Sequence, residues 1–147
     1  MIRDIAPEDR AAFISMMKRL YASKAVTHNV DDSVFAAAFD TALGKSPYLR
    51  ALIIEVDGRP SGYALLSFSY ATETGGLAVL LEDLYLDETC RGKGLGGGFL
   101  RFMESEYPSA KRYRLEVTKA NTKAIELYRR HGYEILDYVQ MVKDNQP

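Results

Sequence analysis

Five glycines crowd a short stretch between an expected strand and an expected helix: Gly92, Gly94, Gly96, Gly97 and Gly98. Glycine has no Cβ, so several backbone N–H groups can converge on one phosphate oxygen, and the positive end of the following helix adds to the attraction. Each glycine also costs up to about 1 kcal/mol relative to alanine inside a helix. We therefore interpret the loop as an anion cradle that is kept for binding rather than for folding.

Two common phosphate-binding patterns do not fit this loop. The Walker-type pattern fails because Asp87 stands where its first glycine is needed. The dinucleotide fingerprint G-x-G-x-x-G is matched from Gly92 to Gly97, but a doubly wound fold places that loop after its first, apolar strand. Here about eighty residues precede the strand, and the strand contains Glu82 and Asp83. We treat the match as accidental, which leaves a dinucleotide oxidoreductase as a distant alternative.

A third pattern combines the loop with its flanks. The loop reads Arg91-x-x-Gly94-x-Gly96, it follows Leu84-Tyr85-Leu86, and a segment from Asn121 through Leu127-Tyr128 to Gly132-Tyr133 comes after it. With these motifs the chain resembles the GNAT superfamily of acyl-CoA-dependent N-acetyltransferases. The motifs cover residues 80–133, and the residues before them fit the family only by their order of elements.

The resemblance implies acetyl-CoA as co-substrate. In this family the loop amides bind the pyrophosphate, and the preceding strand splays from the next one so that its backbone can pair with the pantetheine arm. The loop cations either add charge to the phosphate site or are simply exposed. The positions assigned to the cofactor are Leu84, Tyr85, Leu86, Arg91, Gly92, Lys93, Gly94, Leu95, Gly96, Gly97 and Asn121.

Acetyl transfer to an amine also needs a proton acceptor, because an amine with a pKa near 10.4 is protonated at pH 7. Glu82 and Asp83 precede the splayed strand positions. Adjacent residues point to opposite faces of a regular strand, so at most one of them faces the acceptor unless a bulge intervenes. We choose Glu82, partly because some small-amine acetyltransferases of the family resemble this segment. A surface ion pair is the alternative.

For the departing thiolate, Tyr128 is the candidate acid. It matches the family's tyrosine in the Asn…Leu-Tyr segment, whose hydroxyl lies near the CoA sulfur in many members. A phenol with a pKa near 10 can protonate a thiolate. Tyr128 also lies on the apolar face of its expected helix, so core packing is the alternative.

The sequence says little about the identity of the amine acceptor. Asp31, Asp32 and Asp40 hint at a small cationic molecule, although an N-cap and a solvated helix face explain these acids better. The alternative functions are a protein lysine or N-terminal acetyltransferase and a non-catalytic acyl-CoA-binding module. Small members of the family often pair through sheet edges or helices, so a homodimer is compatible with the resemblance.

Length and composition indicate one domain over residues 1–147. A net charge of −1 gives no electrostatic basis for nucleic-acid binding. The single cysteine excludes an intrachain disulfide and disfavours a zinc site, so we expect no metal. No apolar run approaches the roughly 18 residues of a membrane span, and we expect a cytoplasmic protein without membrane contact.

The pattern of elements predicts a mixed α/β fold with a mostly antiparallel sheet, a splayed parallel strand pair and about four helices. Expected helices follow Pro7, the N-cap Asp31, the glycine loop and the N-cap Asn121, and Gly44 ends the second of them. A hairpin turn is expected at Asp57-Gly58-Arg59-Pro60. The expected strands are 2–5, 49–56, 62–69, 77–86, 113–118, 132–135 and 138–142.

Overall fold

The computed structural model describes residues 1–26 and 28–145, and within them the chain forms one five-stranded sheet in the order β1-β2-β3-β4-β5. The first four strands pair antiparallel, whereas β4 and β5 run parallel. This confirms the predicted mixed sheet with its parallel pair. The strands are β1 (Ile2–Asp4), β2 (Leu49–Val56), β3 (Arg59–Ala71), β4 (Gly76–Leu86) and β5 (Arg112–Leu115).

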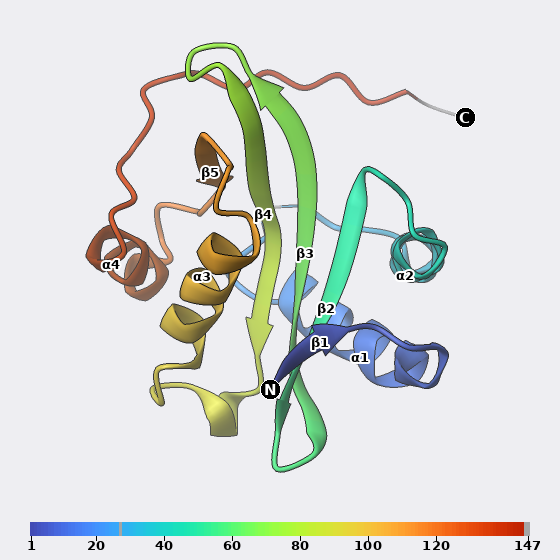
Figure 1. The fold of residues 1–147 in the computed structure, drawn as a ribbon. Helices are drawn as coiled ribbons and strands as arrows, with labels where there is room; N and C mark the ends of the chain where they lie inside the picture. Colours follow the sequence, from blue (N-terminus) through green and yellow to red (C-terminus); the bar gives the residue numbers. More distant parts are fainter. Residues whose placement is uncertain (27, 146–147) are drawn as a thin grey trace.

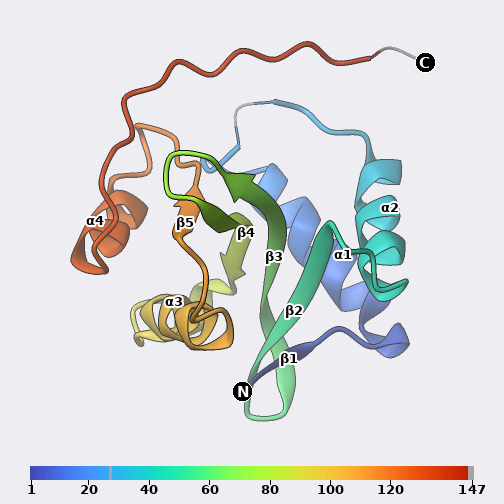
Figure 2. The same ribbon diagram turned by 45° about the horizontal axis from the view of Figure 1, so that its top comes forward.

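Helices cover both faces of the sheet (Figures 1 and 2). The helices α1 and α2 pack on one face, and α3 and α4 pack on the other. Short 3-10 turns precede α1 and the glycine loop. The helical elements are η1 (Pro7–Asp9), α1 (Arg10–Tyr21), α2 (Asp32–Leu43), η2 (Glu88–Cys90), α3 (Leu95–Glu106) and α4 (Thr122–Arg130).

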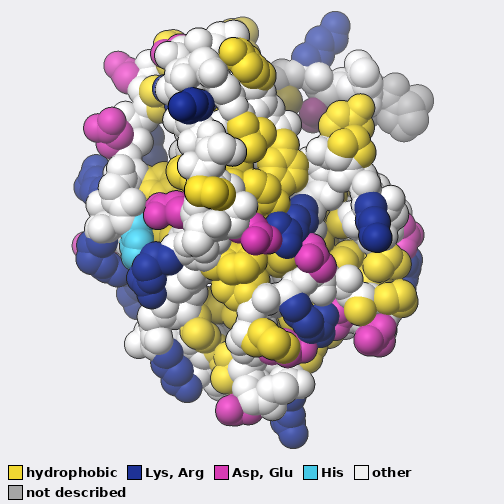
Figure 3. Space-filling model, viewed as in Figure 1, with side chains coloured by type: hydrophobic (Ala, Val, Ile, Leu, Met, Phe, Trp, Pro, Cys, Tyr) yellow, Lys and Arg dark blue, Asp and Glu magenta, His cyan; other side chains and the backbone are white. Residues whose placement is uncertain are grey.

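Each face of the sheet has its own core because successive strand residues alternate between the two faces. Between the sheet and α1–α2, the ring of Phe13 lies 5.4 Å from that of Phe39 and 4.8 Å from that of Tyr63. On the opposite face, Phe99 and Met103 of α3 are fully buried. On the face shown in Figure 3, acidic and basic side chains are interspersed, and hydrophobic ones surface between them.

Local signals in the sequence placed several boundaries correctly. The Asp31 carboxylate accepts a hydrogen bond of 2.9 Å from the Ser33 N–H and caps α2. The chain reverses between β2 and β3 through Asp57 and Gly58, whose φ angles of 51° and 73° suit a two-residue hairpin turn. The turn is therefore shorter than the predicted four residues, and Arg59 already belongs to β3.

The predicted closing strands 132–135 and 138–142 do not form. From Glu134 to Asn145, the backbone makes one backbone–backbone hydrogen bond, between the Tyr138 N–H and the Leu136 carbonyl (2.9 Å). The segment leaves α4 and crosses beyond the end of the sheet (Figures 1 and 2). Strand-forming residues need a neighbouring edge, and β5 ends at Leu115, short of the predicted Thr118. Within the described residues, no helix is long and apolar enough to cross a membrane.

Candidate active site

A β-bulge in β4 turns two adjacent carboxylates toward the same side of the sheet. Opposite β3, Leu65 pairs with Asp83 and Leu66 pairs with Leu81, so Glu82 has no partner residue. The extra residue shifts the alternation along β4. Leu81 and Leu84 therefore contribute to the same core, and the side chains of Glu82 and Asp83 line one cavity on the α1–α2 side.

We call this space the acid cavity. It has a volume of about 390 Å³ and lies between α1, α2 and the strands β3 and β4. Aromatic and small side chains surround its two carboxylates. Its lining residues include Tyr21, Phe35, Ala38, Tyr48, Ser67, Glu82 and Asp83.

Asp83 is the buried acid of the cavity, with 8% of its surface exposed. Its carboxylate accepts hydrogen bonds from the hydroxyls of Tyr63 (2.9 Å) and Tyr21 (3.2 Å). Burial raises the pKa of Asp83 to about 6; the two hydroxyl donors oppose this shift, and the nearby charge of Glu82 adds to it. Burial also raises the pKa of both tyrosine hydroxyls, so they stay protonated donors.

Glu82 is the exposed acid of the cavity, and its carboxylate accepts a hydrogen bond of 2.6 Å from the Ser67 hydroxyl. It stands where β4 and β5 separate, because their pairing ends with Leu81 opposite Leu115. Among the described residues, β4 has no neighbouring strand on that side from Glu82 to Leu86. This is the splayed strand pair expected from the sequence.

The end of β4 leads directly into the loop. The Arg91 side chain folds back, donating from Nε to the Leu86 carbonyl (2.8 Å) while its guanidinium lies 5.7 Å from the centre of the Tyr85 ring. The Tyr85 side chain is buried, and its hydroxyl donates to Asp87 (3.2 Å). Tyr85 can therefore offer a ligand only its backbone. Leu84 is half-buried on the α3 side, as is Leu86.

The loop itself has the shape of an anion-binding helix start. Gly92 and Gly94 adopt left-handed φ angles of 74° and 79°, and Lys93 between them is exposed. The first helical bond of α3 runs from the Gly98 N–H to the Gly94 carbonyl (2.9 Å). The N–H groups of the preceding residues 95–97 are therefore free to point at a ligand at the positive end of α3.

Two of the loop glycines are also needed for the packing of α4 against α3. A Cβ on Gly96 would lie 3.0 Å from a methyl of Leu127, and a Cβ on Gly97 would lie 2.7 Å from Nε2 of His131. These glycines let α4 pack closely against α3. Our interpretation that binding alone keeps the glycines is therefore incomplete. Helix-to-helix contact between residues so distant in sequence leaves no local signal.

The helix α4 carries the remaining two predicted residues. Asn121 caps it, accepting a hydrogen bond of 3.4 Å from the Ala124 N–H. Tyr128 lies in the α3–α4 core, with its ring 5.8 Å from that of Tyr133, and burial raises the pKa of its hydroxyl. Tyr128 and Glu82 thus lie on opposite sides of the sheet and line different cavities.

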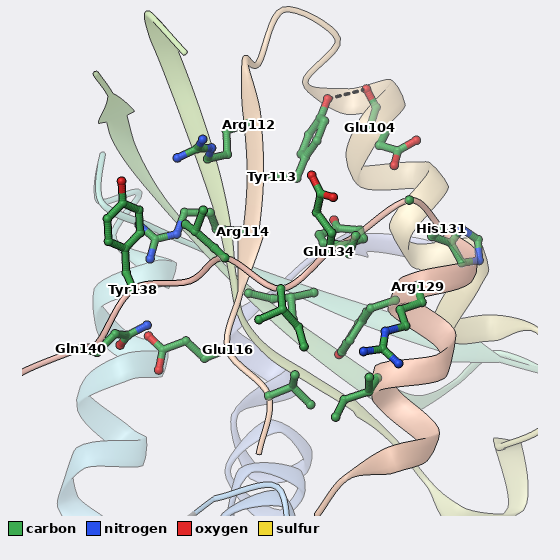
Figure 4. Close-up of a pocket in the computed structure, with 18 of the residues that line it drawn as sticks. Glu104, Arg112, Tyr113, Arg114, Glu116, Arg129, His131, Glu134, Tyr138 and Gln140 are labelled. Carbon is green, nitrogen blue, oxygen red and sulfur yellow. Dashed lines mark hydrogen bonds between the residues drawn. The ribbon is translucent and has the colours of Figure 1, made fainter. Parts of the chain in front are cut away.

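The second cavity, which we call the edge cavity, has a volume of about 840 Å³ (Figure 4). It lies between β5, α4 and the C-terminal residues 132–140, and Tyr128 is part of its wall.

Comparison with known proteins decides the family. The sequence model described as "Acetyltransferase (GNAT) family" matches residues 14–133. The chain belongs to this family. It is an acyl-CoA-dependent N-acetyltransferase, as the resemblance of its motifs implied.

A relative in sequence agrees with this assignment, and solved structures share the fold. The mouse thialysine N-epsilon-acetyltransferase is 29% identical over 145 residues, which cover 92% of this chain and 84% of the mouse protein. An aminoglycoside N-acetyltransferase in complex with CoA has a TM-score of 0.79 at 16% identity, covering 99% of this acetyltransferase and 95% of that chain. A predicted acetyltransferase from Clostridium acetobutylicum with acetyl-CoA has a TM-score of 0.77 at 20% identity. The match covers 97% of this chain and 95% of that chain.

The acids of α2 have structural roles in this acetyltransferase. Besides its N-cap Asp31, the helix carries Asp32, which pairs with Lys18 of α1 (3.2 Å), and Asp40, which pairs with Arg10. These contacts join α2 to α1, so the hint of a cationic acceptor does not come from these residues.

Sequence reasoning missed the two tyrosines that hold Asp83. Tyr21 lies 62 residues before Asp83 and Tyr63 lies 20 residues before it, on two other elements. No spacing rule connects such positions. Only the packing of α1 over β3 and β4 brings the hydroxyls to the carboxylate.

Proposed function

We propose that this acetyltransferase moves an acetyl group from acetyl-CoA to a primary amine of a small cationic molecule, by direct transfer while both substrates are bound. The observation that carries the proposal is the bulge of β4, which brings Glu82 and Asp83 together where β4 separates from β5. A thioester held at that separation would meet an amine bound in the acid cavity.

The glycine loop supports the cofactor side of the proposal. The free N–H groups of residues 95–97 suit pyrophosphate oxygens, and the unpaired edge of β4 at Leu84 and Leu86 suits the amides of the pantetheine arm. Lys93 can add charge to the phosphate site. In this structure Arg91 holds the Leu86 carbonyl, so we assign it first to positioning that edge.

The acid cavity supports the amine side. At about 1.36 kcal/mol per pKa unit, releasing the proton of an amine with pKa near 10.4 at pH 7 costs on the order of 4 to 5 kcal/mol. We assign Glu82 to accept this proton, because its exposed carboxylate can pass the proton to water. Asp83 would attract the ammonium group and position it, fixed by the hydroxyls of Tyr21 and Tyr63.

Tyr128 would protonate the departing thiolate. Its hydroxyl keeps its proton because burial raises its pKa, and the helix that carries it packs against α3, whose first turn forms the loop. In the balanced sequence, the ammonium first loses one proton to Glu82 and then to water. The amine nitrogen then bonds to the acetyl carbon, the carbon–sulfur bond breaks, Tyr128 gives its proton to the thiolate, and the second proton leaving the nitrogen restores the Tyr128 hydroxyl through water.

The acceptor class follows from the size and lining of the acid cavity. A volume of about 390 Å³ suits a small molecule, and the rings of Tyr21, Phe35 and Tyr48 can contact a cation while the two carboxylates neutralise it. The mouse relative named for thialysine and the neighbour named for aminoglycosides both point to amines of this kind.

The test is release of CoA from acetyl-CoA in the presence of thialysine, lysine, a polyamine, an aminoglycoside or a lysine-containing peptide. We expect turnover with at least one small amine. Glu82→Gln should lower kcat/KM at least tenfold and flatten its pH dependence, whereas Glu8→Gln, which removes an exposed acid on η1, should match the wild type. Turnover with the peptide alone would favour a protein acetyltransferase, and acetyl-CoA binding without any turnover would favour a non-catalytic module.

A further inference from the structure

The end of β4 has a strand beside it on one side only. Its pairing with β5 stops at Leu81, whereas its pairing with β3 continues as far as Leu86. We call residues 83–87 the free segment; it begins with Asp83 and ends with Asp87. A binding edge must hold its position to within a fraction of an ångström. The free segment therefore needs a support that replaces β5.

The last turn of α1 contacts the carboxylates at both ends of the free segment. The Tyr21 hydroxyl donates to Asp83 (3.2 Å), and Nη1 of Arg19 donates to Asp87 (2.9 Å). The other nitrogen of the guanidinium, Nη2, donates to the Ser15 hydroxyl (3.1 Å), which fixes the Arg19 side chain against its own helix. The helix α1 is thus the second support of the free segment.

Asp87 connects this support to the backbone that an acyl donor would meet. Its N–H donates to the Ser61 carbonyl of β3 (2.8 Å). The peptide bond before Asp87 is trans, so the Leu86 carbonyl points the opposite way, to the open edge of β4. The Asp87 carbonyl accepts from the Cys90 N–H (2.9 Å) and so begins the turn into the glycine loop. A shift of Asp87 would move both the edge carbonyl and the loop.

The contact between Arg19 and Asp87 fixes geometry more than it stabilises the fold. Among the described residues, two side chains donate to the Asp87 carboxylate, and of these only Arg19 comes from another element. The second donor, the Tyr85 hydroxyl, belongs to β4 and moves with it. The Arg19 and Asp87 side chains are 56% and 29% exposed. Ion pairs with such exposure add little to overall stability.

We propose that Arg19 is a positioning residue for the acyl donor. By holding Asp87, it fixes the Leu86 carbonyl and the start of the glycine loop relative to the acid cavity. This assignment rests on the proposed function, which places the pantetheine arm at the edge of β4. Arg19 acts through Asp87 and not on the donor itself. One helix would then serve both substrates, with Tyr21 on the amine side and Arg19 on the donor side.

The first test is acetyl-CoA binding by calorimetry, which needs no amine. Arg19→Gln should weaken binding about fivefold, or about 1 kcal/mol at 1.4 kcal/mol per tenfold, and Arg19→Lys should lose less. Asp87→Asn should weaken binding too, and adding Arg19→Gln to it should cause no further loss. Lys18→Gln is the matched control, because it removes a neighbouring cation of α1 that pairs with Asp32 (3.2 Å), and it should bind like the wild type.

Two outcomes of this test separate the two proposals. A wild type that does not bind acetyl-CoA would overturn the proposed function and this assignment with it. A wild type that binds acetyl-CoA, with Arg19→Gln within twofold of it, would overturn this assignment alone. Urea should unfold Arg19→Gln and Lys18→Gln at the same concentration. An earlier transition for Arg19→Gln alone would show that the pair holds the fold and would also overturn the assignment.

The second test separates positioning from a distant charge effect on the phosphates. S-Acetylpantetheine carries the thioester and the arm but no phosphate. Arg19→Gln should lower kcat/KM at least twofold for this donor as well as for acetyl-CoA, with an unchanged KM for the amine. Tyr21→Phe should show the reverse pattern, with a raised KM for the amine and unchanged binding of acetyl-CoA. A loss confined to acetyl-CoA would show that Arg19 acts only as a charge and would overturn the proposal.

Discussion

Replacing Asp83 with asparagine should stabilise the fold at alkaline pH. The carboxylate is 8% exposed, and burial raises its pKa from 3.8 to about 6. Between these two values the folded protein holds a proton that the unfolded chain has released. The free energy of unfolding of the wild type therefore falls as the pH rises from about 4 to 6, and the loss is complete above the folded pKa.

The size of this effect follows from the two pKa values. At about 1.36 kcal/mol per unit, the difference between 3.8 and about 6 corresponds to roughly 3 kcal/mol. Asparagine carries no charge and escapes this cost. Its amide oxygen can accept from one of the two tyrosine hydroxyls, and the loss of the other hydrogen bond costs about 1 kcal/mol. The variant should therefore gain about 2 kcal/mol at pH 8 and lose about 0.5 kcal/mol near pH 4, where the unfolded wild type has already released part of its proton.

Urea unfolding at several pH values between 4 and 8 measures this directly. The wild type and Asp83→Asn should differ by an amount that changes sign across this range. Glu8→Gln is the control, because it removes an exposed carboxylate that does not line the acid cavity, and its stability should follow that of the wild type within about 0.5 kcal/mol. Parallel curves for the wild type and Asp83→Asn would show that burial does not disfavour the charge on Asp83.

Three further predictions concern α3, its loop and α4. Gly97→Ala should lower the free energy of unfolding by about 1–3 kcal/mol in urea, because its Cβ would lie 2.7 Å from His131, whereas Gly98→Ala, whose Cβ would have nothing nearer than 3.9 Å, should raise it by up to about 1 kcal/mol. Gly94→Ala should weaken acetyl-CoA binding at least tenfold by calorimetry, because its φ of 79° disfavours a side chain; unchanged affinity would remove the loop from the cofactor site. Tyr128→Phe should reduce kcat more than twofold with an unchanged KM for acetyl-CoA, and a smaller loss would rule out the acid role.

Much of the fold could be predicted because its signals are local. A cap such as Asp31 or Asn121 acts within its own helical turn, and the pair Asp57-Gly58 requires only the φ angles of its own two residues. The glycine loop was recognisable for the same reason, since its residues follow one another between a strand and a helix. The motif order around it was enough to indicate the family.

The acid cavity depends on information that no single strand contains. From Glu82 and Asp83 alone, the alternation of a regular strand puts the two carboxylates on opposite faces. Their convergence results from the register with β3, where Leu65 and Leu66 skip one residue of β4. The same holds for the closeness of Gly97 to His131, which requires α4 to be in place. Both are properties of packed pairs of elements.

The C-terminal segment shows that strand-forming residues do not by themselves form a strand. Its residues have the composition of a strand, and the prediction of closing strands was reasonable on that ground. A strand is stabilised by its neighbour, however, and the exit of the chain at Tyr138 leads these residues past the edge of β5. A segment with strand-forming residues therefore becomes a strand only where the path of the chain brings it beside a free edge.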